Sequence, residues 1–194
     1  QVVSIFTDLR DSTRLGEKKM PYDVLFILNQ FFAEMTEALR ESGGLYAQFT
    51  GDGLMALYGL DTDDTETMIR DALHGAAGML RRIENLNEHL KSELPHTLRI
   101  GIGIHMGEAI VGEMGPPGRE NISAFGDTIN TAARLESQTK KHGVPLVISK
   151  AIFDHGPIPL PENAVMHEVA LRGKDQTVAY YALENMPELP ERVV

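Results

Sequence analysis

The stretch from Gly44 to Gly59, GLYAQFTGDGLMALYG, constrains the fold most, because two apolar runs flank the turn Thr50-Gly51-Asp52-Gly53. Asp-Gly between such runs is the strongest short-range signal of a β-hairpin, since Gly accepts the positive φ of a tight turn. The sequence therefore predicts a hairpin with Asp52 at its tip. On this stretch alone, Asp52 is either a turn residue or a functional acid, and the second role needs another acid within reach.

A second acid follows a strand near the N-terminus. Val2 to Asp8, VVSIFTD, reads as a buried strand that ends at Asp8. The next residues, up to Thr13, lead through capping-type side chains toward a helix, and the free N–H groups of such a junction suit phosphate oxygens. If this strand and the hairpin are neighbours, Asp8 and Asp52 converge into an oxygen-ligand site for Mg²⁺ or Mn²⁺. If they are not, the two acids are unrelated.

The spacing of apolar residues predicts two helices and a strand in the centre of the chain. Apolar residues recur at helical spacing from Val24 to Leu39 and from Met68 to Ile83, which predicts two amphipathic helices. In the strand TLRIGIGIH the isoleucines alternate with Gly101 and Gly103, so the glycine face permits close approach by a helix, a partner chain or a ligand. The acids between Asp61 and Glu66 are interpreted as helix capping rather than a metal cluster.

A third helix runs from Thr128 through INTAARLESQTKKHG and ends near Gly143. Asn130 and Arg134 lie one turn apart on it and share a face. Arg134 either pairs with a carboxylate or lies in solvent, or it projects with Asn130 toward a phosphate group. Strands are expected at 144–149, 165–170 and 177–183, with two cations, Arg172 and Lys174, in the last connecting turn.

Composition limits the classes of function. The 194 residues suit one domain with a substantial core, and the net charge of −10 argues against nucleic acid or an anionic membrane as a partner. The chain has no Cys, which excludes disulfides and Cys-ligated zinc and suits a cytoplasmic location. No apolar run approaches the roughly 18 residues of a membrane span. Because the chain opens directly into a strand, we expect a fused or associated regulatory or sensor domain outside it.

Four motifs in order, FTDLRDST, TGDGLMA, RIGIGIHMGEAIVG and FGDTINTAARLE, resemble the catalytic domain of the class III nucleotidyl cyclases, the adenylate and guanylate cyclase family. The resemblance runs from Val3 to about Leu183. It implies an α/β (α+β) fold: a ferredoxin-like βαββαβ core with a mainly antiparallel sheet, helices packed on one face, and a head-to-tail homodimer. It also implies a catalytic domain over 1–185, followed by a tail or linker over 186–194. Such enzymes convert a nucleoside triphosphate to the 3′,5′-cyclic monophosphate and pyrophosphate.

The resemblance assigns roles to individual residues. Asp8 and Asp52, with the backbone carbonyl of Leu9, are the expected ligands of two divalent ions, Mg²⁺ or Mn²⁺. Asn130 is expected to orient the ribose and Arg134 to stabilise the transition state at the α-phosphate. The candidate phosphate-binding residues are Arg172, with Lys174 as its backup, Arg119 and Thr13. In the dimer the aspartates come from one chain and Asn130, Arg134 and Arg172 from the other.

The chain departs from the family at the positions that read the base. Adenylate cyclases usually carry Lys with Asp or Thr there and guanylate cyclases Glu with Cys, whereas this chain has Gln48 and Ser123. Both side chains donate and accept hydrogen bonds, so each suits adenine or guanine. Without the guanine-type pair, ATP is the favoured substrate. The alternatives are a guanylate or dual-specificity cyclase, or a catalytically silent module that regulates through dimerisation. Asp11, where the family often has Gly, has no assigned role.

Overall fold

The computed structural model describes the chain except for residues 117, 119–120, 171–176 and 191–194. The side chains of residues 46, 47 and 121 are also not described. In chain order the elements are β1 (Val2–Leu9), α1 (Ser12–Lys18), α2 (Pro21–Ser42), β2 (Tyr46–Thr50), β3 (Gly53–Tyr58), α3 (Thr65–His89), β4 (Ile100–Gly107), β5 (Ile110–Met114), β6 (Asn121–Phe125), α4 (Asp127–His142), β7 (Leu146–Ser149), α5 (Lys150–His155), β8 (Met166–Ala170) and β9 (Thr177–Leu183).

One large sheet organises the molecule, with the strand order β2-β3-β1-β4-β7-β9-β8. Its first four strands, joined through α2 and α3, form the expected ferredoxin-like βαββαβ core. Among the described strands β4 and β7 pair in parallel, and the other neighbours in this sheet are antiparallel. The predicted hairpin is confirmed as β2 and β3, which places Asp52 in the turn between them. The sequence therefore predicted the centre of the fold correctly.

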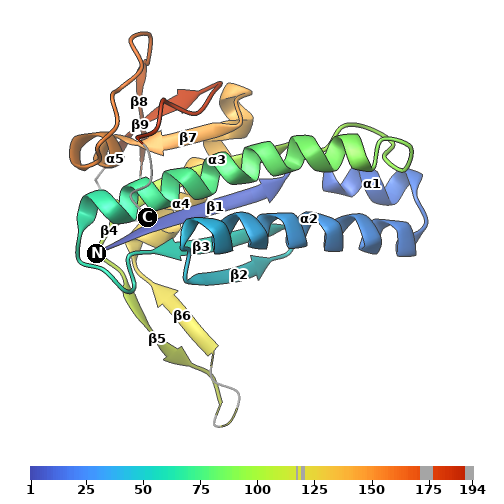
Figure 1. Ribbon diagram of the computed structural model, residues 1–194, viewed down its shortest axis with the longest axis horizontal. Coiled ribbons are helices and arrows are strands. Elements are labelled where there is room, and N and C mark those ends of the chain that lie inside the picture. The colour runs from blue at the N-terminus through green and yellow to red at the C-terminus, as the bar shows by residue number, and fades with distance from the viewer. Residues whose placement is uncertain (117, 119–120, 171–176, 191–194) are drawn as a thin grey trace.

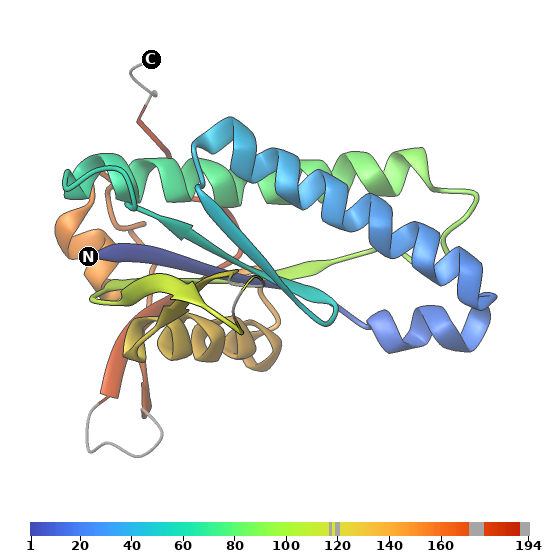
Figure 2. The same cartoon turned by 90° about the horizontal axis from the view of Figure 1, so that it is seen from below.

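Helices cover both faces of the sheet, as Figure 2 shows. The expectation of helices on one face holds for α2 and α3, whose apolar sides join β1, β3 and β4 in the main core. Helix α4 instead lies on the opposite face, directly against β4. The cause is the alternation within β4: Ile102 and Ile104 face the main core, while Gly101 and Gly103 leave space for a helix on the other face. The sequence left open whether a helix, a partner chain or a ligand approaches the glycine face, and the structure shows a helix there.

Two further segments lie outside the large sheet: one projects from the core and the other packs against it. Strands β5 and β6 form a separate two-stranded sheet that projects from the body as an arm (Figure 1). At the other end of the chain, Met186 and Leu189 pack against the main core, and the ring nitrogen Nε2 of His74 lies 2.9 Å from the carbonyl oxygen of Pro190. In the described part of the chain, no helix combines the length and apolar character that a membrane span requires.

The seating of α4 on β4 gives a stability prediction. A Cβ atom at position 103 would overlap the backbone nitrogen of Glu136 and the carbonyl oxygen of Ala132, neither of which can move without the helix. We expect Gly103→Ala to lower the free energy of unfolding by about 1–3 kcal/mol, the usual cost of overpacking. Urea denaturation measures this difference. Gly112→Ala, where the added Cβ meets nothing within 4 Å, is the matched control. Equal stability of the two variants would contradict the close helix–strand packing.

Candidate functional site

The two acidic side chains singled out by the sequence, Asp8 and Asp52, meet where β1 ends. In the register of β1 and β3, Asp8 lies opposite Gly53, the residue that follows Asp52. The backbone N–H of Leu9 donates to the carbonyl oxygen of Asp52 at 3.2 Å, which ties the end of β1 to the hairpin turn. A Cβ atom at Gly53 would lie 2.6 Å from the carbonyl oxygen of Thr7, so glycine is needed for this approach. The condition that β1 and the hairpin are neighbours is confirmed.

The two carboxyl groups have opposite pKa shifts. Burial raises the pKa of Asp8, and the nearby charge of Asp52 adds to the shift, while a hydrogen bond from Lys140 opposes it. Burial also disfavours the ionised form of Asp52. Hydrogen bonds from the Ser12 hydroxyl, from a backbone N–H and with the Asp8 side chain, together with the charge of Lys140, hold the pKa of Asp52 below its usual value. Full ionisation of the pair places two like charges side by side.

This set of donor atoms fits a hard divalent cation. Two carboxylates and nearby main-chain carbonyl oxygens are the ligands that Mg²⁺ and Mn²⁺ prefer, and neighbouring carboxylates repel each other unless a cation joins them. In the part of the chain that the structure describes, no group of three or more His, Asp or Glu residues is arranged so that it could hold a metal ion. A metal ion held by Asp8 and Asp52 would therefore need further ligands from the main chain, from water or from a bound substrate.

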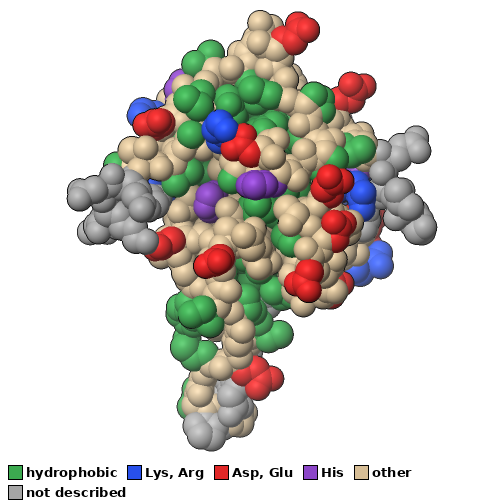
Figure 3. Space-filling view, turned by 90° about the vertical axis from the view of Figure 1, so that its left-hand side faces the viewer, with side chains coloured by type: hydrophobic (Ala, Val, Ile, Leu, Met, Phe, Trp, Pro, Cys, Tyr) green, Lys and Arg blue, Asp and Glu red, His purple; other side chains and the backbone are tan. Residues whose placement is uncertain are grey.

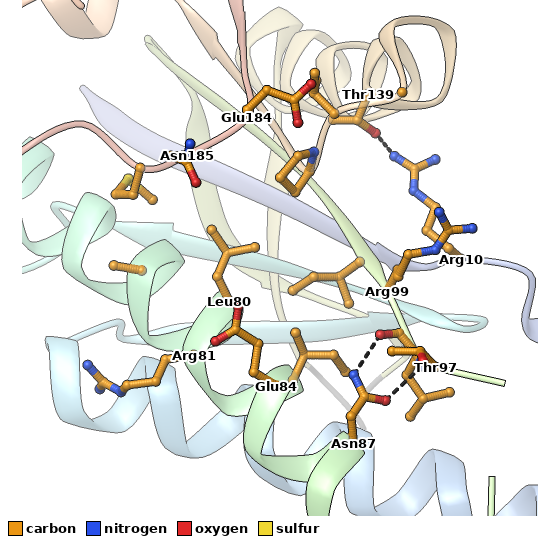
Figure 4. Close-up of a pocket in the computed structure, with 18 of the residues that line it drawn as sticks. Arg10, Leu80, Arg81, Glu84, Asn87, Thr97, Arg99, Thr139, Glu184 and Asn185 are labelled. Atoms are coloured by element: carbon orange, nitrogen blue, oxygen red, sulfur yellow. Dashed lines mark hydrogen bonds between the residues drawn. The ribbon is translucent and has the colours of Figure 1, made fainter. Parts of the chain in front are cut away.

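The C-terminal half of α4 holds the segment that carries Asp8. The ammonium group of Lys140 lies 3.1 Å from Oδ2 of Asp8. Two residues after Asp8, the guanidinium group of Arg10 donates to the Thr139 hydroxyl (Figure 4) and lies 3.7 Å from the buried carboxylate of Glu136. Sequence reasoning did not assign these contacts, because they join residues more than a hundred positions apart. The glycines of β4 were the signal that a helix lies here.

A pocket of about 740 Å³ opens beside this contact, between α3, the start of β4 and the end of α4 (Figure 4). Arg10 and Lys140 line it together with apolar side chains such as Leu80 and Ile83. Acidic residues, among them Glu84 and Glu184, also border it. The pocket leaves open space next to the Lys140 side chain.

Asn130 and Arg134 lie toward the other end of α4. Asn130 precedes Lys140 by ten residues, which corresponds to about 15 Å along the helix axis. Arg134 donates to the carbonyl oxygen of Ala170, the last described residue before segment 171–176. Within one chain, α4 therefore brings its C-terminal end to Asp8 and carries Asn130 away from it.

The other candidate residues are placed in part. Gln48 is exposed on β2, whereas Ser123 is on β6, in the separate arm, opposite Gly112. Thr13 is exposed in the first turn of α1. The remaining phosphate-binding candidates, Arg119, Arg172 and Lys174, lie outside the described residues. Asp11 adopts a left-handed backbone conformation with φ of 54° and forms a 3.2 Å ion pair with Arg99.

The hydrogen bond from Ser12 gives a prediction about the carboxyl pair. We expect Ser12→Ala to raise the pKa of Asp52, because the ionised carboxylate loses a hydrogen bond that favours it. Carbon-13 NMR titration of the aspartate carboxyl groups in metal-free protein measures the change. Thr13→Ala, an exposed neighbour on the same helix, is the control and should leave this titration in place. An unchanged Asp52 titration in Ser12→Ala would contradict the assigned contact.

Comparisons with known proteins place this geometry in a family. Residues 1–185 match the adenylate and guanylate cyclase catalytic domain. The adenylate cyclase of Anabaena cylindrica is 30% identical over 189 residues, which are 93% of this chain but 36% of that protein. The chain thus spans about a third of this relative's length.

Solved structures agree on the fold. The guanylyl cyclase Cya2 superimposes with a TM-score of 0.83 at 26% identity, over 97% of this chain and 94% of that one. The adenylyl cyclase CyaB from P. aeruginosa gives a TM-score of 0.79 at 22% identity, over 95% and 94% of the two chains. With the match over residues 1–185, these findings show that the chain belongs to the adenylate and guanylate cyclase catalytic domain family.

Proposed function

We propose that this chain is a nucleotidyl cyclase that converts ATP to 3′,5′-cyclic AMP and pyrophosphate, with active sites shared between two copies. The observation that carries the proposal is the meeting of Asp8 and Asp52 through the register of β1 and β3. In a family of cyclase domains, two adjacent carboxylates are explained if they bind the cations that triphosphate chemistry needs. A pair with only a structural role would have the repulsion between like charges and no bound cation to offset it.

In the proposed reaction, the ribose 3′-hydroxyl gives up its proton to solvent, its oxygen bonds to the α-phosphorus, and the bond from that phosphorus to pyrophosphate breaks. Asp8, Asp52 and the Leu9 carbonyl would hold two divalent ions, Mg²⁺ or Mn²⁺. When bound there, these ions would supply positive charge that lowers the pKa of the 3′-hydroxyl and neutralises the phosphate oxygens. Asn130 orients the ribose, and Arg134 offsets the charge that develops at the α-phosphate in the transition state. Arg172, with Lys174 and Arg119, binds the triphosphate in this proposal.

Two observations support a shared site. Within one chain α4 carries Asn130 about 15 Å along the helix axis from Lys140, which contacts Asp8, so the helix separates Asn130 from the carboxyl pair of its own chain. The β5–β6 arm also exposes apolar side chains along its length (Figure 3): Ile110, Met114, Ile122 and Phe125. A two-stranded hairpin with such a surface is poorly stable in water alone. A second copy that covers the arm and supplies Asn130 and Arg134 accounts for both.

Base selection rests on Gln48 and Ser123. Relatives of both kinds match this chain, so the similarity alone does not choose between ATP and GTP. We propose ATP because the guanine-reading pair of Glu and Cys is absent from these two positions. A guanylate or dual-specificity cyclase is the alternative, since an amide and a hydroxyl each match either base.

The test is product formation from ATP and from GTP, with Mn²⁺ and with Mg²⁺. We expect cyclic AMP as the main product, and loss of turnover by at least about a hundredfold in Asp8→Asn and in Asp52→Asn, because each removes a charged ligand. Asp63→Asn, an exposed loop carboxylate, is the matched control and should retain full activity.

Three other results would each contradict one part of the proposal. Cyclic GMP alone would overturn the assignment of the base. Substantial turnover in Asp8→Asn or Asp52→Asn would remove the metal-site assignment. If protein shown to be dimeric and to bind Mn²⁺ forms neither product, the regulatory-module alternative replaces the cyclase proposal.

A further inference from the structure

A cationic side chain already lies at the proposed metal site. The Lys140 ammonium group is 3.1 Å from Oδ2 of Asp8, within direct ion-pair distance. The Lys140 side chain is 58% exposed and that of Asp8 is 24% exposed, so the lysine reaches inward from the surface to a more buried carboxylate. Lys140 thus places a positive charge beside the acidic pair.

The backbone of Lys140 is fixed, while its side chain has room to move. One turn earlier on α4, Glu136 is buried, and Thr139 receives a hydrogen bond from Arg10. These contacts anchor the end of the helix beside the segment that carries Asp8. Lys140 borders the 740 Å³ pocket, whose wall carries acidic residues such as Glu84 and Glu184 and also the cations Arg10, Arg81 and Arg99. A displaced ammonium group therefore has open space to enter, beside charges of both signs.

An ammonium group and a divalent ion both bind through carboxylate oxygen lone pairs, and their like charges repel at the short separation that sharing one carboxylate would impose. We propose that Lys140 is a resident counter-cation of the metal site, which holds Asp8 in the metal-free protein and must leave it when a divalent cation binds. Lys140 then sets how much metal the domain requires. The inference rests on the proposed function, because it takes Asp8 as a metal ligand.

The experiment measures Mn²⁺ binding to the nucleotide-free chain, by the electron paramagnetic resonance signal of free Mn²⁺, so that it does not depend on turnover. We expect Lys140→Met to lower the dissociation constant for Mn²⁺ about fivefold, the scale of one partly exposed ion pair. Lys140→Gln should shift it in the same direction. Lys141→Met is the matched control, because it removes the same charge from the exposed neighbouring position and should change the constant much less.

The Mn²⁺ measurements distinguish failure of the Lys140 proposal from failure of the metal site itself. Equal shifts in Lys140→Met and Lys141→Met would overturn the proposal in favour of a general effect of net charge. Weaker Mn²⁺ binding in Lys140→Met would overturn it in the other direction, since the lysine would then orient Asp8 for the metal. If the wild-type chain binds no Mn²⁺, or if Asp52→Asn binds it equally well, the metal site of the proposed function fails instead.

Discussion

Two carboxylates brought side by side by strand pairing are the constraint on which the rest of the site depends. The register of β1 and β3 places Asp8 beside the turn that holds Asp52, and the missing side chain of Gly53 permits the approach. Like charges so close are unfavourable unless other groups offset them. Ser12 stabilises the ionised form of Asp52, and Lys140 pairs with Asp8. Both contacts therefore act on two adjacent carboxyl groups, whose oxygen atoms suit a divalent cation.

Helix α4 connects this constraint to the remainder of the fold. It lies against the glycine face of β4, and its C-terminal half contacts the segment after β1 through Glu136 and Thr139. Its N-terminal half carries Asn130 and Arg134 away from the carboxyl pair. If a second copy supplies those two residues, one helix contacts the carboxyl pair of one active site and presents Asn130 and Arg134 to the other. Displacement of α4 would then disturb both sites together.

The sequence predicted the parts of the structure that local patterns determine. Asp-Gly between apolar runs specified the hairpin, and the alternation of isoleucine and glycine in β4 predicted a close approach on one face. The position of α4 on that face and the contacts of Lys140 and Arg10 were not predictable in the same way. They join residues about 130 positions apart, and a single sequence carries no local signal for such pairs. Base preference was also left open, since Gln48 and Ser123 are chemically ambivalent.

The central claim, that each active site takes its carboxyl pair from one chain and Arg134 from another, is tested by mixing two defective variants. Asp8→Asn and Arg134→Ala each damage both sites of a homodimer, but a mixed dimer contains one intact site. After subunit exchange of equal amounts, the account predicts recovery to about a quarter of wild-type turnover, because half of randomly formed dimers are mixed and each has one working site. A mixture no more active than the sum of its separate components, with exchange verified, would contradict the shared site.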